Sequence, residues 1–204
     1  MSAKIITDSA AQSVKKWVID SDVENQLRSQ ALKGRLKDKS LSHGSIELSL
    51  RCTNLTVITW PDCKQTLSMC LSLLRVDLSG CTKLESIPML SFADCRHLAS
   101  VVFGEHSNIM NIEANAFQDC FALTSITLPD KLTVIENFAF SLCSALEHVV
   151  FNKNLKTIAH SAFNCCSKLE GITLPDKLKV IEEMVFNKCT SLERVVCNKP
   201  QDYW

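Results

Sequence analysis

The sequence predicts an α/β solenoid in which stacked coils place a parallel sheet on a concave face, behind a helical N-terminal cap. Three observations support this prediction. Apolar residues recur with a period of 23 or 25 residues, apolar and polar residues alternate once in each unit, and residues 1–45 contain no repeat. The chain has 204 residues, of which 46% are apolar and 22% charged, enough for a continuous core.

A column of cysteines sets the register of the repeat. Its members are Cys70, Cys95, Cys120, Cys143, Cys166 and Cys189. The first two spacings are 25 residues and the other three are 23 residues. In the unit of Cys143, apolar residues follow at Leu146, Val149 and Phe151, and every other unit has apolar residues at the equivalent positions. Counting each cysteine as position zero, the apolar residues at positions six and eight alternate with mostly polar or small residues, which indicates a half-buried strand.

The second half of each unit returns through another apolar set, which reads Leu132, Ile135 and Phe140 in one unit. The two extra residues of the longer units fall between the strand and this return segment, where a loop can accommodate them. Pro129 and Pro175 end their strands, because proline cannot donate a hydrogen bond to a ladder. We expect irregular or short helical turns on the return side, with the phenylalanines packed behind the sheet.

These residues resemble the leucine-rich repeats of the BspA-like type. The motif of that family stands here as Leu123, Ile126, Leu128-Pro129, Leu132, Ile135, Ala139-Phe140 and Cys143. The resemblance covers residues 46–198, as six units that begin at Cys52 and end at Lys188, followed by a final strand. It implies a curved solenoid used for recognition. Such repeats occur on the surfaces of bacteria and protists and in intracellular proteins, so the family does not fix one partner.

The two ends lie outside the repeat. In residues 1–45, Val14, Trp17 and Val18 predict one short amphipathic helix, and a second is expected to carry Val23, Leu27, Ala31 and Leu32. We expect these helices to cover the open end of the first coil. Residues 199–204 form a C-terminal tail. This tail is either the end of a fragment or a short segment in which Tyr203 and Trp204 fold over the last coil.

Composition narrows the classes of partner. Lysine plus arginine and aspartate plus glutamate number 22 each, so the chain lacks the positive field typical of nucleic-acid binders. No apolar run is long enough to cross a membrane, and no secretory signal is apparent. We therefore expect a monomeric cytoplasmic protein that binds another protein rather than nucleic acid or a membrane.

Eleven cysteines raise the question of disulfides, metal or catalysis. Their column favours small buried thiols in a reducing compartment, because stacked parallel side chains fit thiols better than bridges. Cys165 and Cys166 lie near His160, but no positioned base or zinc-ligand spacing accompanies them. No catalytic residue, metal or cofactor is expected.

Strand alternation points to the working surface. Positions five and seven of each unit face outward on the concave side, and position four lies at its edge, acidic in the last three units. The candidate partner-binding residues are Arg75, Asp77, Val102, Thr127, Glu147, His148, Val150, Glu170, Thr173, Glu193 and Arg194. Glu136 and Glu182 are expected on the convex side, where charge reversal should affect neither binding nor stability.

Two functional hypotheses belong to different classes. The first is an intracellular, non-enzymatic interaction module that acts as an adaptor, inhibitor or effector. The second is a surface adhesin that contacts a host protein or extracellular matrix. The missing export signal and the reduced cysteines favour the first. An enzyme would require a catalytic domain beyond this sequence.

Overall fold

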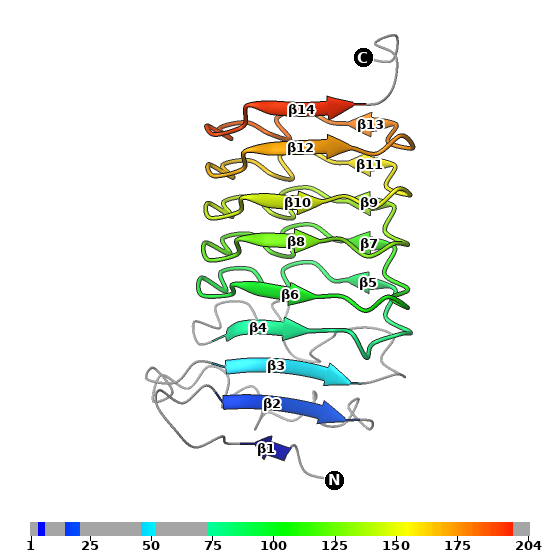
Figure 1. Cartoon of the computed structure of the whole chain (residues 1–204), viewed down its shortest axis with the longest axis vertical. Helices are drawn as coiled ribbons and strands as arrows, with labels where there is room; N and C mark the ends of the chain where they lie inside the picture. The colour runs from blue at the N-terminus through cyan, green and yellow to red at the C-terminus, as the bar shows by residue number, and fades with distance from the viewer. Residues whose placement is uncertain (1–3, 7–14, 21–45, 52–72, 198–204) are drawn as a thin grey trace.

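Parallel strands run along two opposite sides of a stack of coils in the computed structural model of the protein (Figure 1). The structure describes residues 4–6, 15–20, 46–51 and 73–197. The strands of the first side are β1 (Lys4–Ile6), β2 (Lys15–Asp20), β3 (Ile46–Arg51), β4 (Leu73–Asp77), β6 (Ser100–Val102), β8 (Ser125–Thr127), β10 (His148–Val150), β12 (Gly171–Leu174) and β14 (Arg194–Cys197). Those of the second side are β5 (Ser86–Ile87), β7 (Asn111–Ile112), β9 (Val134–Ile135), β11 (Thr157–Ile158) and β13 (Val180–Ile181).

The first side, which we call the front sheet, runs in chain order from β2 to β14, with every described pair parallel. β1 pairs antiparallel with β2 at the N-terminal edge. Equivalent residues of successive repeats lie side by side, as in the pairing of Val149 with Ile126. Hydrogen-bonded pairing is interrupted between β6 and β8 and between β10 and β12, although these strands remain neighbours. The predicted parallel sheet is therefore confirmed. The repeat pattern of the sequence does not predict the two interruptions in its pairing.

The helix expected around Val14, Trp17 and Val18 is wrong, because Lys15–Asp20 is strand β2. The spacing of Trp17 and Val18 fits either element, but the run Trp17-Val18-Ile19 is rich in residues that favour strands. β2 pairs over six residues with β3, and this long-range pairing fixes the strand. The second expected helix, the unit of Cys52 and the C-terminal tail lie outside the described residues.

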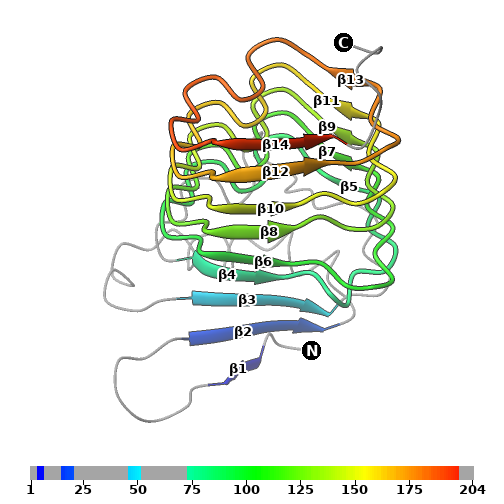
Figure 2. The ribbon, with the colours of Figure 1, turned by 45° about the horizontal axis from the view of Figure 1, so that its top comes forward.

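The second side, which we call the back ladder, consists of the five two-residue strands β5 to β13 (Figure 2). They pair in parallel, so that Ile135 lies between Ile112 and Ile158. Of the irregular or short helical turns expected on this side, residues 73–197 contain irregular ones, with extended or turn-like connections and no helix. Each return segment has apolar residues at its start and at its end. Because these residues are buried by stacking on the neighbouring coils, a second ladder is favoured over isolated helical turns.

The core lies between the front sheet and the back ladder. Phe92, Phe117, Phe140 and Phe163 are fully buried and stack with ring centroids 5.2 Å apart. Such offset stacks add specific stabilisation to the burial of each ring. Most members of the other repeat columns are buried as well, whereas Phe103, Phe151, Ile181 and Phe186 are partly buried and the coil of β14, the last described strand, is the most exposed. There Val195 stands in a core column and is 53% exposed.

Polar side chains also link successive coils. The Glu136 carboxylate accepts hydrogen bonds from the Ala114 N–H (3.0 Å) and from Asn111 Nδ2 (2.6 Å) of the preceding coil. Glu182 accepts from the His160 N–H at 2.8 Å in the same way. Both residues therefore satisfy donors of the preceding coil, so we expect charge reversal at either position to lower stability, in contrast to the expectation from the sequence. Alternation alone did not predict these contacts, which join residues 22 to 25 positions apart.

The turns between the back ladder and the cysteine column use left-handed backbone without glycine. Each of the five described coils has two residues with φ between 55° and 63°, four positions apart. One of the two positions is held by Leu90, Asn115, Phe138, Ser161 and Met184. Asparagine adopts this conformation readily, whereas leucine, phenylalanine and methionine do so at a cost.

We expect Met184→Asn to raise the free energy of unfolding by about 0.5–1 kcal/mol, because Met184 has a φ of 60° and is 59% exposed, so little packing is lost. Asn115 already occupies the equivalent position of another coil. Urea unfolding followed by circular dichroism measures the change. The matched control is Glu183→Asn at the exposed neighbouring residue, which is not in the left-handed region and should give no gain.

Candidate partner-binding face

The structure brings the predicted site residues together on the outward surface of the front sheet. Arg75 and Asp77 lie on β4, Val102 on β6, Thr127 on β8, His148 and Val150 on β10, Thr173 on β12 and Arg194 on β14. Glu147, Glu170 and Glu193 each stand immediately before one of the last three strands. Thr127, His148, Val150, Thr173 and Arg194 are exposed, while Arg75, Asp77 and Val102 are partly buried. We call this surface the outer face.

The side chains of Asp77 and Glu147 form polar contacts within the chain. Asp77 Oδ1 accepts a hydrogen bond from the Ser79 N–H at 3.0 Å, which closes the turn after β4. Glu147 Oε1 lies 3.4 Å from Lys168 Nζ, and the side chains are 39% and 61% exposed, respectively. Exposed ion pairs of this kind contribute little to stability. Glu147 is therefore available to a partner, whereas Asp77 has a local structural role.

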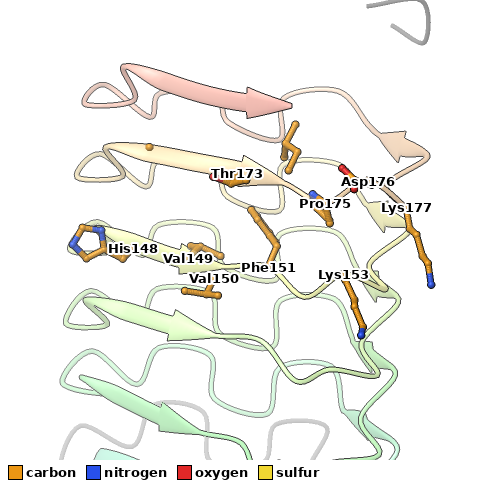
Figure 3. A pocket seen from close by; sticks show the side chains of 11 residues that line it. His148, Val149, Val150, Phe151, Lys153, Thr173, Pro175, Asp176 and Lys177 are labelled. Carbon is orange, nitrogen blue, oxygen red and sulfur yellow. The ribbon is translucent and has the colours of Figure 1, made fainter. Parts of the chain in front are cut away.

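The outer face contains a hollow of about 850 Å³ between the ends of β10 and β12 (Figure 3). We call it the Val150 hollow, because Val150 lines it and is 56% exposed. Phe151, Leu174 and Pro175 supply further apolar surface. Charged and titratable groups are added by His148, Lys153, Asp176 and Lys177.

A second hollow of about 390 Å³, the Val102 hollow, lies between the ends of β6 and β8. Its apolar surface comes from Val102, Phe103, Leu128 and Pro129, and its charges come from Glu105 and Asp130. Both hollows coincide with the interruptions of front-sheet pairing. Sequence alternation predicted Val102 and Val150 but missed the charged turn residues, which follow the strands and belong to no alternating column.

The Val102 hollow also depends on a glycine. A Cβ atom added at Gly104 would lie 2.4 Å from the carbonyl oxygen of Ser79, closer than atoms of a folded chain can approach. The turn after β6 therefore packs directly on the preceding coil. A side chain at this position would force the two coils apart next to the hollow.

The cysteine column is buried next to the phenylalanines. Four thiols of the column, those of Cys120, Cys143, Cys166 and Cys189, donate a hydrogen bond to a phenylalanine carbonyl of the preceding coil, as from Cys143 Sγ to Phe117 O at 3.2 Å and from Cys120 Sγ to Phe92 O at 3.3 Å. Burial raises the pKa of Cys120 and Cys143. A hydrogen bond with Cys189, together with burial, raises the pKa of Cys166. A thiol with a raised pKa stays protonated at neutral pH and is a poor nucleophile.

The neighbourhood of Cys165 has a structural explanation as well. Cys165 occupies one of the left-handed turn positions and is partly buried. The ring of His160 packs edge-on against Phe138, with centroids 5.5 Å apart. These contacts account for both side chains without a catalytic pair.

In the part of the chain that the structure describes, no three histidine, cysteine, aspartate or glutamate side chains are grouped so as to hold a metal ion. None of the described residues forms a helix with the length and apolar character needed to span a bilayer.

Known proteins resemble this chain in repeat and in fold. The family model for the BspA type leucine rich repeat region matches residues 63–193 in six copies. The crystal structure of a leucine-rich-repeat protein of T. pallidum is 30% identical, with a TM-score of 0.53, over 55% of this chain and 51% of that one. The pneumococcal vaccine antigen PcpA is 23% identical, with a TM-score of 0.51, over 76% of this chain and 31% of PcpA. This second likeness shows the fold alone. No curated protein is significantly similar in sequence.

Proposed function

The chain belongs to the BspA-type leucine-rich-repeat family, and on this basis we propose that it is a non-enzymatic protein–protein interaction module that binds its partner on the outer face. An adaptor, an inhibitor and an effector all fit this description. The chain spans about half the length of the treponemal protein, with 51% of it covered.

The observation that carries the proposal is the exposed apolar surface of the outer face beside a hollow. Rows of short side chains leave the face open to close approach, and Val150 is 56% exposed beside a hollow although it stands in a regular strand. Exposed apolar residues that border a polar rim are typical of binding surfaces. The front sheet and the back ladder hold these residues in place, so the binding surface is already formed before a partner binds.

The raised pKa of Cys120 and Cys143 supports a non-enzymatic role for these two thiols, because a protonated thiol is a poor nucleophile. We also propose a reducing compartment, the cytoplasm, because the thiols of the column from Cys120 to Cys189 form no disulfide in the fold. The alternative is a surface adhesin. PcpA, which has a similar fold, is described as a vaccine antigen. Binding to an extracellular host or matrix protein, with no intracellular partner, would favour this alternative.

We expect the double variant Glu147→Lys, Glu170→Lys to lose or slow binding to the cognate partner while its melting temperature stays nearly unchanged. Both side chains border the outer face and their exposure keeps their contribution to stability small. Surface charges act mainly on encounter and specificity, so the association rate should fall most. An affinity pull-down with the parent chain identifies the partner, and surface plasmon resonance then compares the variants.

The matched control is Lys156→Glu, Lys179→Glu. Both lysines are exposed and immediately precede β11 and β13 of the back ladder, so the control also reverses two charges but on the opposite side. It should retain the partner. If this control loses binding while the outer-face variant keeps it, the partner uses the back of the solenoid.

A further inference from the structure

The two hollows of the outer face have a fixed spacing. The Val102 hollow lies between β6 and β8, and the Val150 hollow lies between β10 and β12, which is two coils further along the stack. Neighbouring parallel strands are about 4.8 Å apart, so the two hollows are separated by about 10 Å. Between them, β8 and β10 form an unbroken three-residue pairing. A partner that fills both hollows must therefore cross this closed part of the sheet.

The two hollows differ in charge. The Val102 hollow is bordered by the exposed carboxylates of Glu105 and Asp130, and no cation lines it. The Val150 hollow is bordered by the exposed ammonium groups of Lys153 and Lys177, by His148 and by one carboxylate, Asp176. Figure 3 shows Lys153 and Lys177 on the turns that follow β10 and β12.

Arg194 adds to the positive character of the Val150 hollow. A Cβ atom at Gly171, which lines this hollow, would lie 3.6 Å from Arg194 Nε and 3.7 Å from Nη2. The Arg194 guanidinium group thus lies next to Gly171, where a larger residue would place its side chain. The outer face is acidic at one hollow and basic at the other, and complementary charges on a partner fix its orientation.

We propose, building on the function proposed above, that the partner presents a polyproline II segment with apolar side chains three residues apart. An acidic residue of the segment lies beside the Val150 hollow, and a basic residue lies beside the Val102 hollow. Polyproline II rises about 3.1 Å per residue with three residues per turn, so residues i and i+3 share a face and are about 9.3 Å apart. This distance matches the separation of the hollows.

Other backbone conformations match less well. An extended strand places side chains of one face about 6.8 or 13.6 Å apart, which misses the spacing. A helix places residues i and i+7 about 10.5 Å apart, but its intervening side chains at i+3 and i+4 would meet the closed pairing of β8 and β10. A polyproline II segment has no side chain on that face between its anchors. Its free carbonyl groups can accept hydrogen bonds from exposed hydroxyls such as those of Thr127 and Thr173.

The test uses fluorescein-labelled synthetic peptides and fluorescence anisotropy with the full chain. The matching peptide is KPVPPVPE, in which the valines are three residues apart and the charges differ. One comparison peptide, KPVPVPE, shortens the valine spacing by one residue, and two others, EPVPPVPE and KPVPPVPK, carry like charges. We expect the matching peptide to bind about tenfold tighter than the shortened one, since only one valine of the latter can be buried. It should bind several-fold tighter than either like-charged peptide.

A charge switch in the protein sharpens the test. The variant Glu105→Lys, Asp130→Lys makes both hollows basic, so its preference should change from KPVPPVPE to EPVPPVPE. Because two peptides are compared on one variant, a change in stability does not affect the result. The control Lys156→Glu, Lys179→Glu should keep the parent's preference.

The outcomes separate this proposal from the function on which it rests. Equal binding of all four peptides, no binding up to about 1 mM, or tighter binding of a helical peptide with valines seven residues apart overturns the polyproline II proposal. If a protein partner is still lost on reversal of Glu147 and Glu170, the interaction module stands without it. If the peptides discriminate as expected but no protein partner responds to the outer-face variants, the peptide site is real and the proposed function is wrong.

Discussion

Replacing Phe163 with alanine is expected to lower the free energy of unfolding by about 3–5 kcal/mol. The ring is fully buried and has three aromatic neighbours. It stacks on Phe140 at 5.2 Å and on Phe186 at 5.8 Å, and it meets the edge of Phe151 at 5.8 Å. The substitution removes these contacts and leaves a cavity that neighbouring coils cannot close without shifting their own ladders.

Two further substitutions test the register of the same coil. Leu146→Ala should lower the free energy of unfolding by about 2–5 kcal/mol, and Val149→Ala should have a smaller effect because valine loses fewer atoms. Both side chains are buried. The matched control is Phe138→Ala, which removes the same ring from a site that is 36% exposed and should cost much less. Thermal and urea unfolding give the order of the four variants. Parent-like melting of all three core variants would show that the register is wrong.

The core could be predicted because the pattern of apolar residues that forms it is contained within each unit and recurs in every unit. One unit, from Leu146 through Phe163, already shows the alternation and the return segment, and five neighbours in register confirm it. Stacking then follows from the need of each coil to cover its apolar stripe. The N-terminal segment lacks this redundancy. Trp17 and Val18 fit a helix or a strand by spacing, and the choice is made by pairing with β3, which lies about 30 residues further along the chain.

The sequence predicted which residues lie on the outer face, but it did not predict the hollows in that face. Alternation put Val150 and Thr173 on one surface, because successive residues of a strand point to opposite sides. The hollows depend on interrupted pairing after β6 and β10, which no residue pattern marks. The left-handed turns are hidden for a related reason, because Phe138 and Met184 hold positions where glycine or asparagine would have been recognised. These features arise from packing between coils rather than from local preference.

Alkaline pH is expected to destabilise the fold through the cysteine column. Thiols in an unfolded chain have a pKa of about 8.5. Burial raises the pKa of Cys120 and Cys143 in the folded chain, so both keep their protons where the unfolded chain loses them. Above about pH 9 the folded state therefore binds more protons than the unfolded state, and the free energy of unfolding falls as pH rises. The two thiols together should contribute a slope of about 3 kcal/mol per pH unit, with no effect below about pH 8.

Urea unfolding between about pH 7.5 and 10 in the presence of a reductant measures this slope. Cys143→Ser removes one titrating thiol but keeps a hydroxyl that can donate to the Phe117 carbonyl, so the slope should fall by about 1.4 kcal/mol per pH unit. Cys120→Ser should give an equal decrease, because its thiol donates to Phe92 O in the same way. The comparison uses slopes, so a constant loss of stability in either variant does not matter. A variant with the parent's slope would mean that its thiol ionises in the folded chain, and the column would then be open to solvent and to reaction.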